Sequence, residues 1–139
     1  YGVIECLKAS EILNKFNISC EIIDLRVLHE LDKKTILNSV KKTKKVIVVD
    51  NGWSKYGISA EIISVIIEEI GLDLQYKPIR LGNMQTSLPS TRHLAKYWYL
   101  SHQDIIRNVC KIFKINYKEI KIKDSYTNDV PNEQFKGPF

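Results

Sequence analysis

The chain has 139 residues, 44% of them hydrophobic, and a formal net charge of +5. This length supports one globular core. No apolar run approaches the roughly 20 residues that cross a bilayer, and the amino terminus has no signal-peptide pattern. We therefore expect a cytoplasmic protein with no membrane partner. The positive charge comes mainly from lysines spread along the chain, without the clustered arginine and aromatic side chains that read nucleic acid, so we expect no nucleic-acid partner.

The first predicted element is a helix over residues 3–16, where apolar side chains recur at helical spacing. This pattern starts within a few residues of Tyr1, whereas a parallel α/β domain ordinarily begins with a strand. We therefore expect a fragment in which only the last residues of the first strand remain. Residues 19–28, SCEIIDLRVL, follow as a predicted strand.

Asp32 is placed to cap a second helix, which runs to about Thr43 and buries apolar residues on one face. Residues 45–50, KVIVVD, form a continuous apolar run between charged residues and a glycine. This pattern is typical of a central parallel strand with both faces covered.

The loop DNGWSKYG, residues 50–57, resembles at first the phosphate-binding turns that lead into a helix. Its two glycines are five residues apart and enclose two bulky aromatic residues, whereas a phosphate cradle needs close backbone amides with little bulk around them. We interpret this loop as a structural or interface loop. The alternative is a freestanding small α/β domain that binds a ligand or phosphate with this loop.

A nearly all-apolar helix is predicted over residues 58–70, and a strand with an early proline over 76–82. Ser101 and Asp104 form a capping-box pattern before a last amphipathic helix at 105–113. Strands that alternate with helices predict an α/β three-layer sandwich, with a small, mostly parallel sheet and helices on both faces.

The pattern changes after Lys114, so we divide the chain into a domain at 1–114 and an extension or arm at 115–139. Alternating Ile120 and Ile122 could form one more strand. The rest has turn-forming residues with spaced apolar anchors that we expect to dock on this domain or on a neighbour; fraying is the alternative. The anchors are Tyr126, Val130, Phe135 and Phe139.

The sequence indicates no catalytic, cofactor-binding or metal-binding residues. The three cysteines, Cys6, Cys20 and Cys110, are far apart in apolar surroundings and are predicted as buried free thiols. No histidine has metal-ligand spacing. His29 and Glu30 could act as an acid–base pair beyond a strand end, but two solvated turn residues are the better interpretation.

The stretch EIIDLRVLHELDKKTILNSVKKTKKVIVVDNGWSKYGISAEI resembles the C-terminal domain of the transketolase superfamily. The resemblance is strongest to the beta subunit of the thiamine-diphosphate-dependent 2-oxo acid dehydrogenase component. The later stretch RLGNMQTSLPSTRHLAKYWYLSHQDII is similar to the family's pattern of a strand, a proline-containing loop, a helix, an aromatic patch and a final helix. Matching positions are Asp24, Leu25, Arg26, Leu31, Asp32, Gly52, Trp53, Gly57, Ala60, Glu61 and Ile62.

Two departures leave the substrate and the superfamily member open. His29 and Glu30 replace a small residue and proline, and the family's proline-rich loop is degraded at residues 85–89. A two-carbon ketol transferase or a synthase split into subunits therefore stays open beside the dehydrogenase.

The resemblance implies that thiamine diphosphate and Mg are held by other domains of the full assembly and that this fragment binds neither. It also implies a homodimer or heterotetramer, partners among the other domains or subunits of the same enzyme, and a docking surface for the acyltransferase core of a multienzyme complex. We expect the glycines to let the loop reverse while the tryptophan packs toward another domain, and the aspartate–arginine pair to fix polar contacts at the end of the sheet. The interface or structural residues are Asp24, Arg26, Gly52, Trp53, Gly57 and Glu61.

Overall fold

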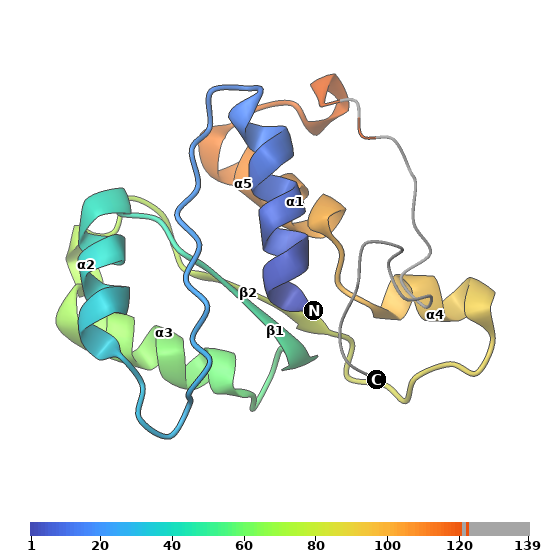
Figure 1. The fold of residues 1–139 in the computed structure, drawn as a ribbon, viewed down its shortest axis with the longest axis horizontal. Coiled ribbons are helices and arrows are strands. Elements are labelled where there is room, and N and C mark those ends of the chain that lie inside the picture. Colours follow the sequence, from blue (N-terminus) through green and yellow to red (C-terminus); the bar gives the residue numbers. More distant parts are fainter. Residues whose placement is uncertain (121, 123–139) are drawn as a thin grey trace.

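The structure is a computed structural model that describes residues 1–120 and residue 122, except for the side chains of Arg92, His93 and Lys96. Helices and two strands follow one another along the chain (Figure 1). Within the described part, no helix is long and apolar enough to span a bilayer. The elements are α1 (Gly2–Asn14), α2 (Lys33–Thr43), β1 (Ile47–Trp53), α3 (Ile58–Glu69), η1 (Gly71–Asp73), β2 (Ile79–Asn83), α4 (Arg92–Trp98), α5 (His102–Phe113) and η2 (Tyr117–Glu119).

Strands β1 and β2 are parallel and in register from the pair Ile47 and Ile79 to the pair Val49 and Leu81. Successive side chains of β1 point to opposite faces, as the pleat requires. Ile47 and Val49 pack against the α1–α5 side, and Val48 packs among residues of α2 and α3. Helices therefore cover both faces of a small parallel sheet, which confirms the predicted α/β architecture (Figure 1).

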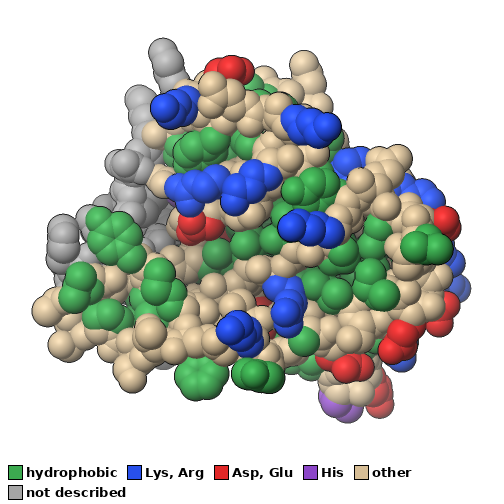
Figure 2. Space-filling view, turned by 180° about the vertical axis from the view of Figure 1, so that it is seen from behind, with side chains coloured by type: hydrophobic (Ala, Val, Ile, Leu, Met, Phe, Trp, Pro, Cys, Tyr) green, Lys and Arg blue, Asp and Glu red, His purple; other side chains and the backbone are tan. Residues whose placement is uncertain are grey.

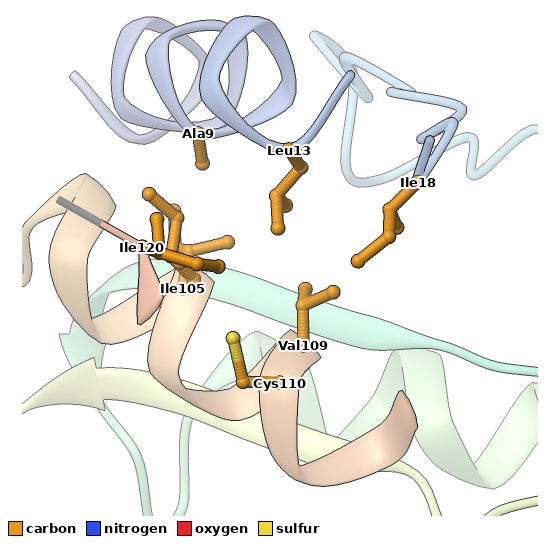
Figure 3. Close-up of a cluster of buried hydrophobic side chains, with 8 residues drawn as sticks. Ala9, Leu13, Ile18, Ile105, Val109, Cys110 and Ile120 are labelled. Atoms are coloured by element: carbon orange, nitrogen blue, oxygen red, sulfur yellow. The ribbon is translucent and has the colours of Figure 1, made fainter. Parts of the chain in front are cut away.

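The α1–α5 layer forms one apolar core (Figure 3). Leu13 of α1 and Ile106 of α5 are fully buried, and Cys110 lies beside them with 1% of its surface exposed. In Figure 3 the labelled side chains of the two helices point toward one another across the gap between them. Fully burying side chains of this size contributes about 1.5 to 3 kcal/mol each, so this pairing holds α1 in place.

The α2–α3 layer forms the second core, with Ile36, Val40, Ile62 and Ile66 buried together. Helix α2 begins where the sequence predicted, because the Asp32 carboxylate accepts a hydrogen bond from the Thr35 backbone N–H at 3.0 Å.

The predicted strand at 19–28 was wrong. These residues have the composition of a strand, yet the structure assigns none to them, and no backbone hydrogen bond joins residues 19–24 to another strand within the described residues. A strand exists only when a neighbour completes its hydrogen-bond ladder, so composition was not sufficient.

The other predictions near the carboxyl end had mixed outcomes. The strand expected at 76–82 lies at Ile79–Asn83, and the last helix starts earlier, at His102, with the Asp104 carboxylate accepting from the Ser101 backbone N–H at 3.1 Å. Residues 117–119 form a 3-10 turn, and Ile120 is buried against the α1–α5 core. The expected anchors Tyr126, Val130, Phe135 and Phe139 lie outside the described residues, so the arm stays a prediction.

Candidate interface site

The loop after β1 is a sharp turn with two aromatic side chains exposed at its surface. Trp53 is 54% exposed and Tyr56 is 94% exposed. The Tyr56 backbone adopts a left-handed conformation with φ of 60°, which is uncommon for a residue other than glycine. Such exposure of aromatic side chains on a fixed turn is typical of surfaces that meet a partner.

Gly57 is required by a close backbone approach. A Cβ added at Gly57 would lie 2.6 Å from the carbonyl oxygen of Trp53, which is closer than real Cβ atoms come. Gly52 donates its backbone N–H to the Asp50 carboxylate at 2.9 Å. The turn therefore depends on glycine at position 57 and on a local carboxylate contact at position 52.

The same geometry disfavours phosphate at this loop. The Asp50 carboxylate lies beside both Gly52 and Gly57, at the start of α3, where the backbone amides would otherwise face an anion. A negative charge already at that place opposes a second one. A cavity of about 600 Å³ is lined by residues before and after the turn but not by residues 52–57, so it does not belong to this loop.

A contact that the sequence did not reveal supports the turn from below. Asn83, at the end of β2, is buried and donates its side-chain amide to the carbonyl oxygen of Asn51 at 2.6 Å. The neighbouring Gly82 is equally constrained, since an added Cβ would lie 2.8 Å from the carbonyl oxygen of Gly52. The only sequence signal for the contact between Asn83 and Asn51 was a polar residue next to the end of a predicted strand.

Asp24 and Arg26 do not lie at the end of a strand as predicted. The Arg26 Nε donates to the Asp24 carboxylate at 3.3 Å, and the two side chains are 83% and 45% exposed respectively. An exposed pair of this kind contributes about 0 to 1 kcal/mol. Arg26 has a left-handed φ of 52°, so the pair marks a turn rather than a sheet contact.

Glu61 is exposed in the first turn of α3, where a carboxylate complements the helix dipole. His29 and Glu30 are both more than 80% exposed, with 3.9 Å between the imidazole Nε2 and the carboxylate. Their exposure agrees with the interpretation as solvated turn residues.

A buried polar cluster at the base of α1 was also missed. Glu5 is 3% exposed, and its carboxylate accepts from the His102 backbone N–H, the His102 Nδ1 and the Lys8 ammonium, each at 2.8 Å. Burial raises the pKa of Glu5, but the hydrogen bonds from His102 and Lys8 outweigh burial and lower it to about 2. The cluster ties the start of α1 to the start of α5.

The cysteines are free thiols, as predicted, and burial raises the pKa of each one. Cys110 is buried, whereas Cys6 and Cys20 are only partly buried. Within the described residues, no group of three or more His, Cys, Asp or Glu side chains could hold a metal ion.

Comparison with known proteins matches residues 1–105 to the family described as "Transketolase, C-terminal domain". The chain is 37% identical over 107 residues to the pyruvate dehydrogenase E1 component subunit beta of Rickettsia felis, covering 76% of this chain and 32% of that protein. It is 35% identical over 115 residues to the mitochondrial subunit of Dictyostelium discoideum, covering 82% of this chain and 32% of the relative. The mitochondrial subunit of Pisum sativum is 38% identical over 101 residues, or 73% of this chain and 28% of its own length.

The chain thus spans about a third of the length of these curated relatives. The family match covers most of the chain, and the α/β fold, with helices on both faces of a small parallel sheet, agrees with this match. The chain therefore belongs to the transketolase C-terminal domain family.

Proposed function

We propose that this chain is the C-terminal domain of a thiamine-diphosphate-dependent enzyme of the 2-oxo acid dehydrogenase beta-subunit or transketolase kind, and that it serves subunit assembly and partner docking. The observation that carries the proposal is the exposed aromatic turn. Trp53 and Tyr56 project from a backbone fixed by Gly57, Asp50 and Asn83, and neither side chain lines the cavity of about 600 Å³. A preorganised aromatic anchor of this kind is suited to binding a protein surface.

The distribution of surface side chains supports the same role. Figure 2 shows hydrophobic side chains gathered in patches on the face opposite to the view of Figure 1, with lysine and arginine side chains among them. On α3, Ile67 is 44% exposed beside a shallow hollow that Ile63 and Pro78 also line. An exposed isoleucine beside this hollow suits a partner on the outer face of α3, in line with the expected burial of this helix on more than one side.

The described residues around the turn before α3 are poorly suited to hold thiamine diphosphate. A diphosphate with its magnesium ion needs free backbone amides or basic side chains and carboxylate ligands for the metal. The turn before α3 places the Asp50 carboxylate beside both glycines, and the described residues hold no metal-ligating cluster. We accordingly propose that thiamine diphosphate and Mg are held by other domains of the assembly.

The partners that we propose are other domains or subunits of the same enzyme, in a homodimer or heterotetramer, and the acyltransferase core of a multienzyme complex. The names of the relatives support a subunit role, because they describe a beta subunit of an E1 component. The cytoplasm is our proposed compartment, although some relatives are named as mitochondrial.

The experiment compares two alanine substitutions, each made in the assembled enzyme. We expect Trp53→Ala to raise the dissociation constant of the subunits about tenfold or more in sedimentation velocity, since losing an aromatic anchor costs at least about 1.4 kcal/mol. Leu72→Ala is the matched control, because Leu72 is fully exposed on η1, away from the turn. The thermal midpoint of the isolated 139-residue chain should be unchanged by either substitution. Equal dissociation constants for Trp53→Ala and wild type would remove the basis of the proposal.

A further inference from the structure

The starts of both strands and the carboxyl ends of α2 and α5 lie at one edge of the sheet, opposite the aromatic turn (Figure 1). The Lys45 ammonium, just before β1, donates to the Gln75 side-chain oxygen at 2.5 Å and lies 5.5 Å from the centre of the Phe113 ring at the end of α5. The Gln75 backbone N–H donates to the Lys44 carbonyl oxygen at 2.9 Å. Segments that are far apart in the chain therefore form one continuous surface.

Lysine side chains dominate this surface. We define the basic face as five residues: Lys44 and Lys45 after α2, Lys77 before β2, and Lys111 and Lys114 at the end of α5. Within the part of the chain that the structure describes, no ion pair joins any of the five to a carboxylate. Positive charges on one surface repel one another, and a negatively charged partner would relieve this repulsion.

Acidic side chains at the same edge have other positions or other partners. Glu68, Glu69 and Asp73 are exposed at the end of α3 and in η1, on the α2–α3 side of the sheet. Glu21 accepts a hydrogen bond from the Lys42 ammonium at 3.0 Å. This pair shows how a carboxylate binds a lysine at the end of α2.

Two lysines of the basic face occupy backbone positions that favour glycine. Lys44 and Lys114 are the C-cap residues of α2 and α5, with left-handed φ values of 57° and 56°. Glycine is the usual residue in such caps, because it has no Cβ. A lysine there complements the helix dipole, but both helices already carry lysine in the last turn, and the dipole does not explain Lys45 and Lys77 at the strand starts. Lysine at two unfavourable positions therefore indicates a use for positive charge at this edge.

The side chains of the basic face favour carboxylates over nucleic acid or lipid. Nucleic-acid binding favours the arginine fork and aromatic rings that are free to stack on bases, and the basic face contains lysine alone. Phe113 is 46% exposed, and one side of its ring is occupied by Lys45. The same contact makes this ring less available for insertion into a lipid surface.

We propose that the basic face is a docking site for a segment of a partner protein that is rich in Asp and Glu. Carboxylates of that segment would accept hydrogen bonds from Lys77, Lys111 and Lys114, as Glu21 accepts one from Lys42. The proposal rests on the docking role proposed above and names the chemistry of one partner. It concerns the edge of the sheet opposite Trp53, so the two surfaces can be tested separately.

The test measures binding of a fluorescein-labelled peptide, Gly-Asp-Glu-Asp-Glu-Asp-Glu-Gly, to the full 139-residue chain by fluorescence anisotropy. We expect this peptide to bind at least about tenfold more tightly than the amide peptide Gly-Asn-Gln-Asn-Gln-Asn-Gln-Gly. Its dissociation constant should rise about tenfold between about 0.05 M and about 0.5 M NaCl, because salt screens exposed charges.

Two double variants locate the binding. Lys77→Gln with Lys114→Gln should weaken binding of the acidic peptide about fivefold or more, whereas arginine at the same two positions should preserve it. The matched control is Lys33→Gln with Lys34→Gln, which removes the same charge from exposed positions at the start of α2 and should change the affinity less than about twofold. Circular dichroism should be the same for all variants, because the substituted side chains are exposed.

Three results would overturn the proposal. The first is equal affinity of wild type and the Lys77 and Lys114 glutamine variant. The second is an equal loss in the Lys33 and Lys34 control, which would show that net charge and not the basic face attracts the peptide. The third is tighter binding of polyuridylate, or of phosphatidylserine–phosphatidylcholine vesicles, that depends on Lys77 and Lys114, which would assign the face to another class of partner.

Trp53→Ala separates this proposal from the proposed assembly role of the aromatic turn. We expect this variant to bind the acidic peptide as the wild type does, since Trp53 lies at the carboxyl end of β1. Loss of peptide binding in Trp53→Ala would contradict the assignment to the basic face.

Discussion

Glu5 gives the most specific energetic prediction in this fold. Its carboxylate is buried and accepts three hydrogen bonds, two of them from His102 at the start of α5 and one from Lys8. These contacts keep the pKa of Glu5 at about 2, below its ordinary value of 4.5. A pKa lowered by this amount corresponds to about 3 kcal/mol of folding stability at neutral pH.

The pH dependence follows from the direction of this shift. The folded protein binds the Glu5 proton more weakly than the unfolded chain does. The contribution of the Glu5 carboxylate to the free energy of unfolding is therefore complete well above pH 4.5 and is lost as the pH falls toward 2. At pH 3 about 1.4 kcal/mol of this stabilisation by Glu5 should remain. Replacing the carboxylate with a neutral amide should remove this pH-dependent part.

Urea unfolding of the wild-type chain and of Glu5→Gln between pH 7 and pH 3 tests this reasoning. We expect the variant to be less stable by about 3 kcal/mol at pH 7, and the difference between the two proteins to narrow by about 2 kcal/mol at pH 3. Glu11→Gln is the matched control, because Glu11 lies exposed on the same helix, and its curve should follow the wild type. A constant difference between Glu5→Gln and wild type across this range would refute the assignment of a buried, stabilising carboxylate.

Two further substitutions test the turn and the core by urea unfolding. Gly57→Ala should cost about 1 to 3 kcal/mol, because its Cβ would clash with the Trp53 carbonyl oxygen, and an unchanged midpoint would show that the turn is not constrained there. Leu13→Ala should cost about 2 to 5 kcal/mol, because the side chain is fully buried between α1 and α5, whereas Leu7→Ala, at a half-exposed position on the same helix, should change stability by about 0.5 kcal/mol or less. Equal losses for the two leucines would contradict the position of the core.

Local signals in the sequence predicted the elements whose causes are local. The Asp32 cap needs only the following helical turn, and the Ser101–Asp104 pair needs only three residues. The apolar run before Asp50 indicated a strand covered on both faces, and the structure places helices on both sides of it. These features together were sufficient for the α/β layers.

Features that depend on distant residues could not be predicted in this way. Glu5 lies in an amphipathic helix where a solvated glutamate would look the same, and its partner His102 is 97 positions away. Asn83 supports the turn through Asn51, 32 positions earlier. The stretch at 19–28 has strand composition, but a strand forms only beside another strand, and that information lies outside its own residues.

We propose that this domain is a scaffold for assembly and that the reaction centre lies in other domains of the enzyme. Isothermal titration calorimetry of the folded 139-residue chain with thiamine diphosphate and magnesium tests it most directly. We predict no saturable heat of binding up to about 1 mM ligand. That concentration would detect a dissociation constant of about 1 mM, which corresponds to a binding free energy of about −4 kcal/mol. A saturable isotherm with one site for each chain, lost on denaturation, would contradict the account.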